Sequence, residues 1–199
     1  MQFVSFEPGI EVNGQTVYAI FDGFATFKTI AADILTGEGI GTTTSEAGFT
    51  LDPAAWYSQD NWLRAFQRVA EKLGDAILFS IGKKIPENAI FPPWVIDIDS
   101  AIRSIDFAYH LNHRKGGTVM FNPETGTMLE GIGHYGYERV EGKNEIVSVC
   151  GNPYPCHFDR GIITTMAQRF QPAARVRHDD TKPCRNKGGE SCTYIVVWK

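Results

Sequence analysis

The feature that most constrains this chain is the position of its four cysteines, which all lie within the last fifty residues. Cys184 and Cys192 flank the segment Arg-Asn-Lys-Gly-Gly-Glu-Ser. A tight turn at its two glycines would join two antiparallel elements and bring both thiols close enough to share an ion. Cys156 precedes a predicted helix, where the positive end of the helix dipole favours a thiolate. Zinc suits such a group because it prefers tetrahedral sulfur and nitrogen ligands.

Other interpretations of these cysteines remain open. The spacing matches neither the C-x-x-C pairs of zinc sites nor the C-x-x-C-H of haem attachment, since five residues separate Cys150 from Cys156. Buried free cysteines behave as small hydrophobes and need no metal. A thiol at a helix start also suits a reactive nucleophile.

Length and composition predict one domain and exclude several function classes. With 199 residues, 43% of them hydrophobic, the chain can bury one sizeable core. A formal charge of −4 and a pI near 5.7 give no basic excess, so we expect no nucleic-acid surface. No secretory signal or bilayer-length apolar run is visible, so we expect a cytoplasmic location and no membrane partner. Cysteines in a reducing compartment favour thiols or metal thiolates over disulfides.

The hydrophobic pattern predicts an α+β fold with helices packed on an antiparallel sheet. We expect three parts within a single domain 1–199: a strand, helix and loop region over 1–50, a helical part over 51–115, and a cysteine-containing part over 116–199. The predicted helices cover 24–35, about 58–82, 100–114 and 158–170, with a rigid proline-containing connection at 91–94. The predicted strands cover 16–21, 118–121, 127–131, 134–140, 145–150, 174–178 and 192–198.

Residues from about 115 to 199 resemble a known family. Asn152-Pro-Tyr-Pro-Cys156, the helix that follows, Val176-Arg-His-Asp-Asp and Cys184-x7-Cys192-Thr-Tyr-Ile-Val are similar to the end of the 4-vinyl reductase-type small-molecule-binding domains. The resemblance implies a fold of the NO-signalling and Golgi-transport ligand-binding type, shared with haem NO-binding domains and a Golgi tethering subunit. It also implies a homodimer.

The family includes sensory domains of phenol-responsive activators, in which zinc is held by one cysteine before the helix, two across the last hairpin and an upstream acidic residue. The resemblance therefore implies Cys156, Cys184 and Cys192 as zinc ligands. For the fourth ligand, Cys150 and Glu138 rank equally, and His134 is chemically as suitable.

Two further groups of residues are candidates for a site. Asp106, His110 and His113 follow one another at helical spacings of four and three, which could form an acid/base or metal patch or a solvated helix end. The segment Gly131 to Glu138 contains His134, Tyr135 and Tyr137 among glycines, which could line a ligand or cofactor pocket or form a bulged strand.

We expect a sensory module that binds a small hydrophobic or aromatic ligand between helices and sheet, with a structural zinc and no turnover. Its output would pass through a homodimer or a separate effector protein. The alternative is a haem or tetrapyrrole sensor or enzyme that uses His110, His113 or His134. A structural assembly subunit is a third hypothesis. No G-x-S-x-G, P-loop or dinucleotide glycine motif is present, which argues against serine hydrolysis and nucleotide chemistry.

Overall fold

A computed structural model describes residues 1–199, apart from the side chains of residues 22 and 25. The helices are α1 (Gly14–Phe21), the 3-10 helix η1 (Asp22–Phe27), α2 (Lys28–Gly37), α3 (Gln59–Leu73), α4 (Asp75–Glu87), α5 (Ile98–Leu111), α6 (Cys156–Phe170) and the 3-10 helix η2 (Arg185–Lys187). The strands are β1 (Ile10–Asn13), β2 (Thr42–Thr44), β3 (Gly48–Thr50), β4 (Trp56–Ser58), β5 (His113–Lys115), β6 (Thr118–Val119), β7 (Phe121–Asn122), β8 (Thr127–Met128), β9 (His134–Tyr135), β10 (Glu138–Arg139), β11 (Glu145–Gly151), β12 (Arg175–His178) and β13 (Cys192–Val197).

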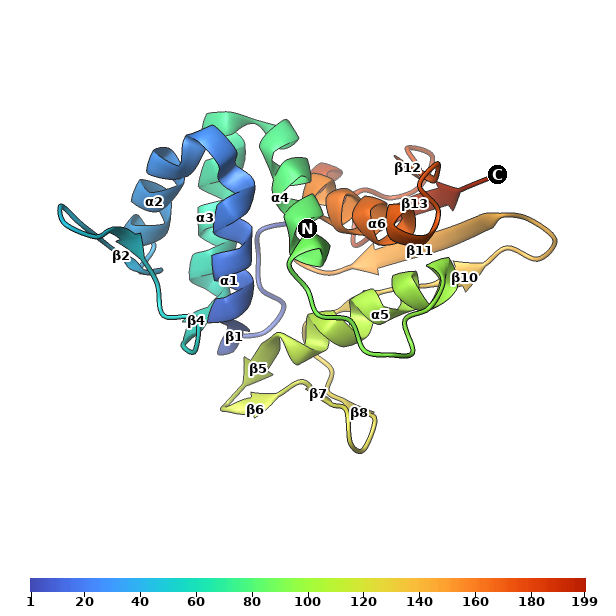
Figure 1. Cartoon of the computed structure of the whole chain (residues 1–199), viewed down its shortest axis with the longest axis horizontal. Coiled ribbons are helices and arrows are strands. Elements are labelled where there is room, and N and C mark those ends of the chain that lie inside the picture. The colour runs from blue at the N-terminus through green and yellow to red at the C-terminus, as the bar shows by residue number, and fades with distance from the viewer.

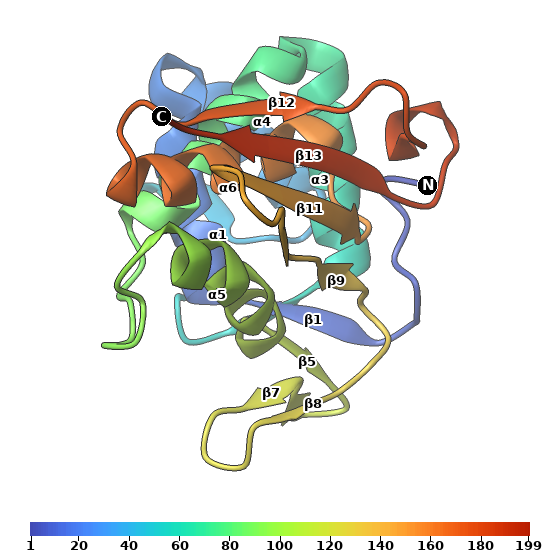
Figure 2. The ribbon, with the colours of Figure 1, turned by 90° about the vertical axis from the view of Figure 1, so that its right-hand side faces the viewer.

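The strands form two main antiparallel sheets. The C-terminal sheet has the order β10-β11-β13-β12, and β9 also pairs with β11. The smaller sheet has the order β4-β1-β5-β6. Helix α6 lies between the C-terminal sheet and α4, and α1 and α3 pack on α4 in turn (Figures 1 and 2). The described residues therefore form the α+β architecture that the hydrophobic pattern predicts.

Local sequence explains where the main helices begin and end. The Ser58 side chain caps α3 by accepting from the Asn61 N–H at 3.4 Å, and Trp62, Phe66 and Val69 make its buried stripe. Helix α5 starts with a capping box in which Asp97 and Ser100 satisfy each other's backbone N–H groups. Helix α6 follows Pro155, whose fixed φ suits the residue before a helix.

Two glycines allow α4 and α6 to approach closely. A Cβ on Gly82 would overlap the carbonyl oxygen of Phe158, and a Cβ on Gly161 would overlap that of Phe79. Because the distance between helix axes depends on the side chains at the contact, both positions need a residue without a side chain. This contact places the N-terminus of α6, with Cys156, against the helical layer.

The prediction of a strand at 16–21 is wrong, because this segment belongs to helix α1. A short run of β-branched and aromatic residues does not distinguish a strand from a buried helix by periodicity. The buried residues Val17 and Ile20 are three apart, as in a helix, and the strand of this region is β1, upstream. The helix predicted at 24–35 corresponds to η1 and α2.

The long helix predicted from about 58 to 82 is two helices. Gly74 separates α3 from α4 and has a φ of 79°, a left-handed conformation that glycine adopts readily. The strands predicted at 118–121, 127–131, 134–140 and 145–150, which we expected to follow one another as an antiparallel meander, do not form one sheet. Strand β6 joins the smaller sheet, and the strand predicted at 134–140 is divided into β9 and β10, which both pair with β11.

None of the described helices combines the length and apolar character needed to span a bilayer.

One hydrophobic cluster joins buried side chains from the N-terminal, central and C-terminal parts of the chain.

Candidate metal centre

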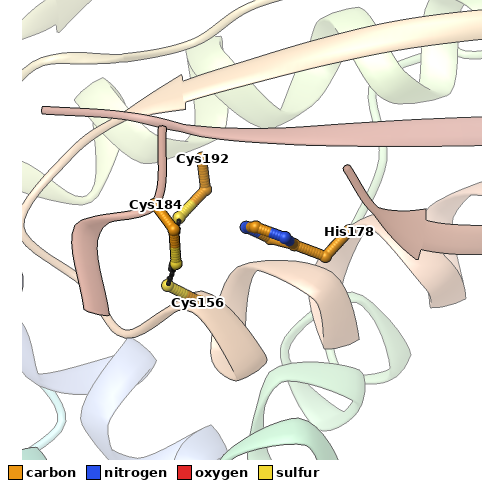
Figure 3. A group of neighbouring side chains, drawn as sticks. All are labelled: Cys156, His178, Cys184 and Cys192. Atoms are coloured by element: carbon orange, nitrogen blue, oxygen red, sulfur yellow. Dashed lines mark hydrogen bonds between the residues drawn. The ribbon is translucent and has the colours of Figure 1, made fainter. Parts of the chain in front are cut away.

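Three cysteines converge at one end of the C-terminal sheet (Figure 3). Cys156 opens α6, Cys184 precedes η2, and Cys192 opens β13. The Sγ of Cys156 lies 3.0 Å from that of Cys192 and 3.6 Å from that of Cys184, and the remaining pair is 3.9 Å apart. Two sulfurs at about 2.3 Å from one tetrahedral ion would lie about 3.8 Å apart. All three thiols are free. Two of the separations, 3.6 and 3.9 Å, are close to this value, whereas Cys156 and Cys192 would move apart by about 0.8 Å around a tetrahedral ion.

The chain turns at Gly188 and Gly189 as its sequence predicts, but Cys184 lies in the connection between β12 and β13, directly before η2, and not at the end of a strand. The N–H groups of Lys187 and Gly189 both donate to the carbonyl oxygen of Cys184 at 2.9 Å. Gly188 has a φ of 84°, and a Cβ on Gly189 would approach the Cys184 backbone to 2.9 Å. The chain thus wraps around Cys184 and returns to place Cys192 beside it.

His178 supplies a fourth donor. It ends β12 opposite Tyr194 of β13, and one ligand atom from each of the three cysteines and this histidine lie within 4.8 Å of one another. Its Nδ1 lies 3.0 Å from Oδ1 of Asp180, while its buried Nε2 has no hydrogen-bond partner. Figure 3 shows the ring pointing towards the sulfurs. A histidine held at one nitrogen by a carboxylate, with the other nitrogen free, is the usual arrangement of a metal ligand.

The two residues that we ranked as fourth ligand lie outside this group of four. Cys150 faces Cys192 across the sheet, but its thiol lies 3.6 Å from the Ser148 hydroxyl, and burial raises its pKa well above the ordinary value. Glu138 is exposed on β10, opposite Val147. His178 belongs to the motif Val176-Arg-His-Asp-Asp and is absent from the predicted ligands; Asp180, two residues later, is the sequence signal that could identify it.

The surroundings of Cys192 favour a thiolate. The hydrogen bond from the Cys156 thiol and the positive charge of Arg185 outweigh burial and together lower the pKa of Cys192 to about 3, whereas the same hydrogen bond and burial raise the pKa of Cys156. The backbone N–H of Arg185 also donates to Cys192 Sγ at 3.4 Å. Negative charge on sulfur is what a soft divalent ion needs.

Arg185 connects the cysteine hairpin to the interior. Its side chain is fully buried and forms an ion pair with Asp159 of α6 and hydrogen bonds with the backbone and side-chain oxygens of Asn152. Asp159 also accepts from the Tyr135 hydroxyl at 2.6 Å. The hairpin, α6 and β9 are therefore joined by one buried polar network.

A second cluster contains two of the predicted histidines. Asp106 and His110 lie one turn apart on α5, and His134 of β9 meets them, with one ligand atom of each within 4.8 Å of the others. The Nδ1 of His134 lies 3.0 Å from Asp106 Oδ2, and its Nε2 lies 3.0 Å from Glu130 Oε2. Burial lowers the pKa of His134, but its bonds to the two carboxylates outweigh this and raise the pKa above its ordinary value.

His113 does not join this cluster. It is buried, with Nδ1 at 2.6 Å from the Tyr109 carbonyl oxygen and Nε2 at 2.7 Å from the Tyr154 hydroxyl. Burial lowers its pKa to about 4. Both nitrogens have partners, so this histidine has the environment of a satisfied core residue.

Tyr135 and Tyr137 do not line a common pocket. Tyr135 is buried in the network with Asp159, whereas the Tyr137 hydroxyl donates to Asp99 at 2.5 Å and its ring stacks under Arg103. Two hollows among the described residues, of about 420 and 300 Å³, are open depressions that border neither cluster. Neither of them is the predicted apolar pocket between helices and sheet.

Comparison with known proteins identifies the fold. No family model and no curated protein matches the sequence. Solved H-NOX domains share the fold: a structure from work on haem distortion in the H-NOX family has a TM-score of 0.61 and 16% identity and covers 94% of this chain and 95% of its own. An H-NOX protein from S. oneidensis in the Fe(II) state has a TM-score of 0.59 and 15% identity, covering 94% and 96%.

An oxygen-binding H-NOX domain related to soluble guanylate cyclases also matches, with a TM-score of 0.59, 14% identity, and coverage of 94% and 95%. The expected fold, shared with haem NO-binding domains, is thereby confirmed. The assignment to the 4-vinyl reductase-type family stays a prediction.

The three histidines considered for haem offer no nitrogen that is both free and accessible in this arrangement of side chains. Of the three histidines considered for haem, His113 has both nitrogens engaged, and His134 lies between two carboxylates. His110 has an Nε2 without a partner, but its ring is fully buried between the rings of Tyr109 and His134, whose centroids lie 5.3 and 4.9 Å away. Neither hollow reaches this nitrogen.

Proposed function

We propose that the chain is a small-molecule-binding or sensory module in which Cys156, Cys184, Cys192 and His178 hold a structural zinc ion. The observation that carries this proposal is the convergence of three sulfurs and a buried, unpartnered imidazole nitrogen within 4.8 Å. Three thiolates and one imidazole make a closed tetrahedral set of the Cys3His kind. Such a site leaves no position for a catalytic water, which supports a role without turnover.

In this proposal the zinc stabilises the end of the C-terminal sheet. Its ligands come from α6, from β12, and from both sides of the η2 turn, so one ion would join segments that the chain places far apart. Binding free energy of a structural zinc is also folding free energy. Removal of the ion should therefore release the 184–192 hairpin rather than silence an activity at an otherwise intact site.

The sensory part of the proposal rests on the fold, since the structural neighbours include an oxygen-binding H-NOX domain and an H-NOX protein in the Fe(II)NO state. The ligand that we propose is small and hydrophobic or aromatic. Output through a homodimer is supported by exposed apolar side chains on α5 and the loop before it, namely Trp94, Ile96, Phe107 and Leu111. Sedimentation of the purified chain tests the dimer.

Zinc content tests the proposal. The full chain, without an affinity tag and dialysed against a weak chelator, should retain about one zinc ion. His178→Ala and Cys184→Ser should lose it, whereas Cys150→Ser and Glu138→Gln should keep it as matched controls. Wild-type protein that is folded and free of zinc would refute the structural zinc site. Equal zinc content in His178→Ala and wild type would refute His178 as the fourth ligand.

Haem sensing is the second candidate function, because the fold is that of haem-binding neighbours and because His110 Nε2 is buried without a partner. It would require α5 and β9 to separate and open a cavity at this nitrogen. Absorption spectra of protein purified with haem supplementation decide between the candidates. We expect no Soret band, and a stoichiometric band that His110→Ala removes would establish haem binding instead.

A further inference from the structure

The cluster at Asp106, His110 and His134 has features of a second metal site, independent of the cysteines. Asp106 and His110 come from one face of α5, and His134 comes from β9, at the point where this strand meets β11. One ligand atom from each of the three side chains lies within 4.8 Å of the others. Two ligands at about 2.1 Å from one ion and at right angles lie about 3 Å apart. The separation of 3.0 Å between Asp106 Oδ2 and His134 Nδ1 matches this value.

Each of the three side chains is oriented by a further contact that leaves one donor atom for an ion. His110 Nδ1 lies 2.8 Å from the Asp106 carbonyl oxygen, which leaves Nε2, and this nitrogen is buried without a partner. His134 Nε2 lies 3.0 Å from Glu130, which leaves Nδ1 for the ion. Asp106 Oδ1 accepts from the Tyr135 N–H at 2.8 Å, which leaves Oδ2. Metal-binding histidines are characteristically held in this way by carbonyl or carboxylate oxygens.

The unpartnered nitrogen of His110 is the independent sign that something binds here. The side chain of His110 is 0% exposed, and a buried polar atom without a hydrogen bond costs about 1 to 3 kcal/mol. An ion at this point would satisfy the nitrogen.

An ion can reach the cluster from solvent. The side chains of His134 and Glu130 are 41% and 80% exposed, whereas that of Asp106 is 20% exposed. The cluster is thus closed on the His110 side and open on the Glu130 side. Three protein ligands would hold the ion, and its remaining coordination positions would face solvent.

We propose that Asp106 Oδ2, His110 Nε2 and His134 Nδ1 bind a divalent first-row transition ion of the Fe²⁺ or Mn²⁺ kind. Two imidazoles and one carboxylate with open positions form the donor set of non-haem Fe²⁺ sites, and carboxylate and imidazole also suit Mn²⁺. This donor set differs in softness from the three thiolates of the Cys3His group, so the two sites would select different metals.

Manganese is the probe that separates the two sites. Because Mn²⁺ lies lowest in the affinity order of these ions, it does not displace zinc from thiolates. Free Mn²⁺ is measured by its electron paramagnetic resonance signal while the ion is added to zinc-loaded, tag-free full chain. We expect about one Mn²⁺ bound per chain.

Variants at the cluster decide the result. His134→Ala and Asp106→Asn should each weaken Mn²⁺ binding on the order of tenfold or more. Glu138→Gln, which removes an exposed carboxylate on the neighbouring β10, should leave binding unchanged. His134 is half-exposed, so its replacement should preserve the fold, as circular dichroism will verify. Cys184→Ser should abolish the zinc site without changing the affinity for Mn²⁺.

Two outcomes would overturn the proposal. Absence of Mn²⁺ binding to wild type would show that the cluster is only a hydrogen-bonded network around a protonated His134. Mn²⁺ binding that is equal in wild type, His134→Ala and Asp106→Asn would place the ion elsewhere. Neither outcome depends on whether the cysteines hold zinc.

Discussion

Replacing Arg185 with methionine should strongly destabilise the protein, because it leaves the carboxylate of Asp159 buried without its cation. Arg185 and Asp159 both have 0% exposed side chains. After the substitution the carboxylate keeps the Tyr135 hydroxyl, which donates at 2.6 Å, and the Asn152 amide at 3.3 Å. Breaking one partner of a buried ion pair costs about 3 to 5 kcal/mol.

Protonation of Asp159 limits this cost. A carboxyl group with an unfolded pKa near 3.9 can take up a proton at pH 7 for about 4 kcal/mol, and at pH 6 for about 3 kcal/mol. We therefore expect Arg185→Met to lower the free energy of unfolding by about 3 to 4 kcal/mol at pH 7 and by about 1 kcal/mol less at pH 6.

Urea unfolding of the zinc-loaded protein at both pH values measures this effect. The double variant with Asp159→Asn should recover part of the loss, because a neutral amide is cheaper to bury than an unpaired carboxylate. Arg177→Met on the exposed face of β12 is the matched control and should change stability by less than about 0.5 kcal/mol. A cost below about 1 kcal/mol for Arg185→Met, or a double variant less stable than the single one, would refute this reasoning.

Three further predictions concern other parts of the structure. Because the pKa of His113 is about 4 in the folded state and near 6.5 unfolded, the unfolded state binds more protons between these values. The free energy of unfolding should thus fall by up to about 3 kcal/mol as the pH drops from 6.5 to 4, and chemical denaturation should show a flatter profile for His113→Gln. Gly82→Ala should lower the free energy of unfolding by about 1 to 3 kcal/mol in urea titrations, because its Cβ overlaps the Phe158 carbonyl oxygen; an unchanged value would contradict the close contact of α4 and α6. Asp180→Asn should weaken zinc binding about 10- to 100-fold in a chelator competition, since Asp180 orients His178, and an unchanged affinity would remove it from that role.

The approach of Cys184 to Cys192 can be predicted from the sequence because its determinant, the turn at Gly188 and Gly189, is local. The grouping of both with Cys156 rests on the family resemblance, and its role as a zinc site stays a prediction. The fourth donor depends instead on strand register, since the pairing of His178 with Tyr194 decides that this histidine faces the sulfurs. No local pattern specifies that register.

The histidine cluster also depends partly on local sequence and partly on contacts between distant segments. The helical spacing of Asp106 and His110 is visible in the sequence, but their meeting with His134 depends on how β9 packs against α5. His113 follows at the next helical step, yet its environment is decided by Tyr154 from a distant part of the chain. The strand predicted at 16–21 was wrong for a similar reason, because its short apolar run suits a buried helix equally well.

The most direct test of the central claim is zinc X-ray absorption spectroscopy of the purified full chain after dialysis against a weak chelator. We predict three sulfurs at about 2.3 Å and one nitrogen at about 2.0 Å, with the multiple scattering of an imidazole that His178→Ala removes. Four sulfurs would contradict His178 and implicate Cys150, and a shell of oxygens and nitrogens without sulfur would contradict the cysteine site altogether.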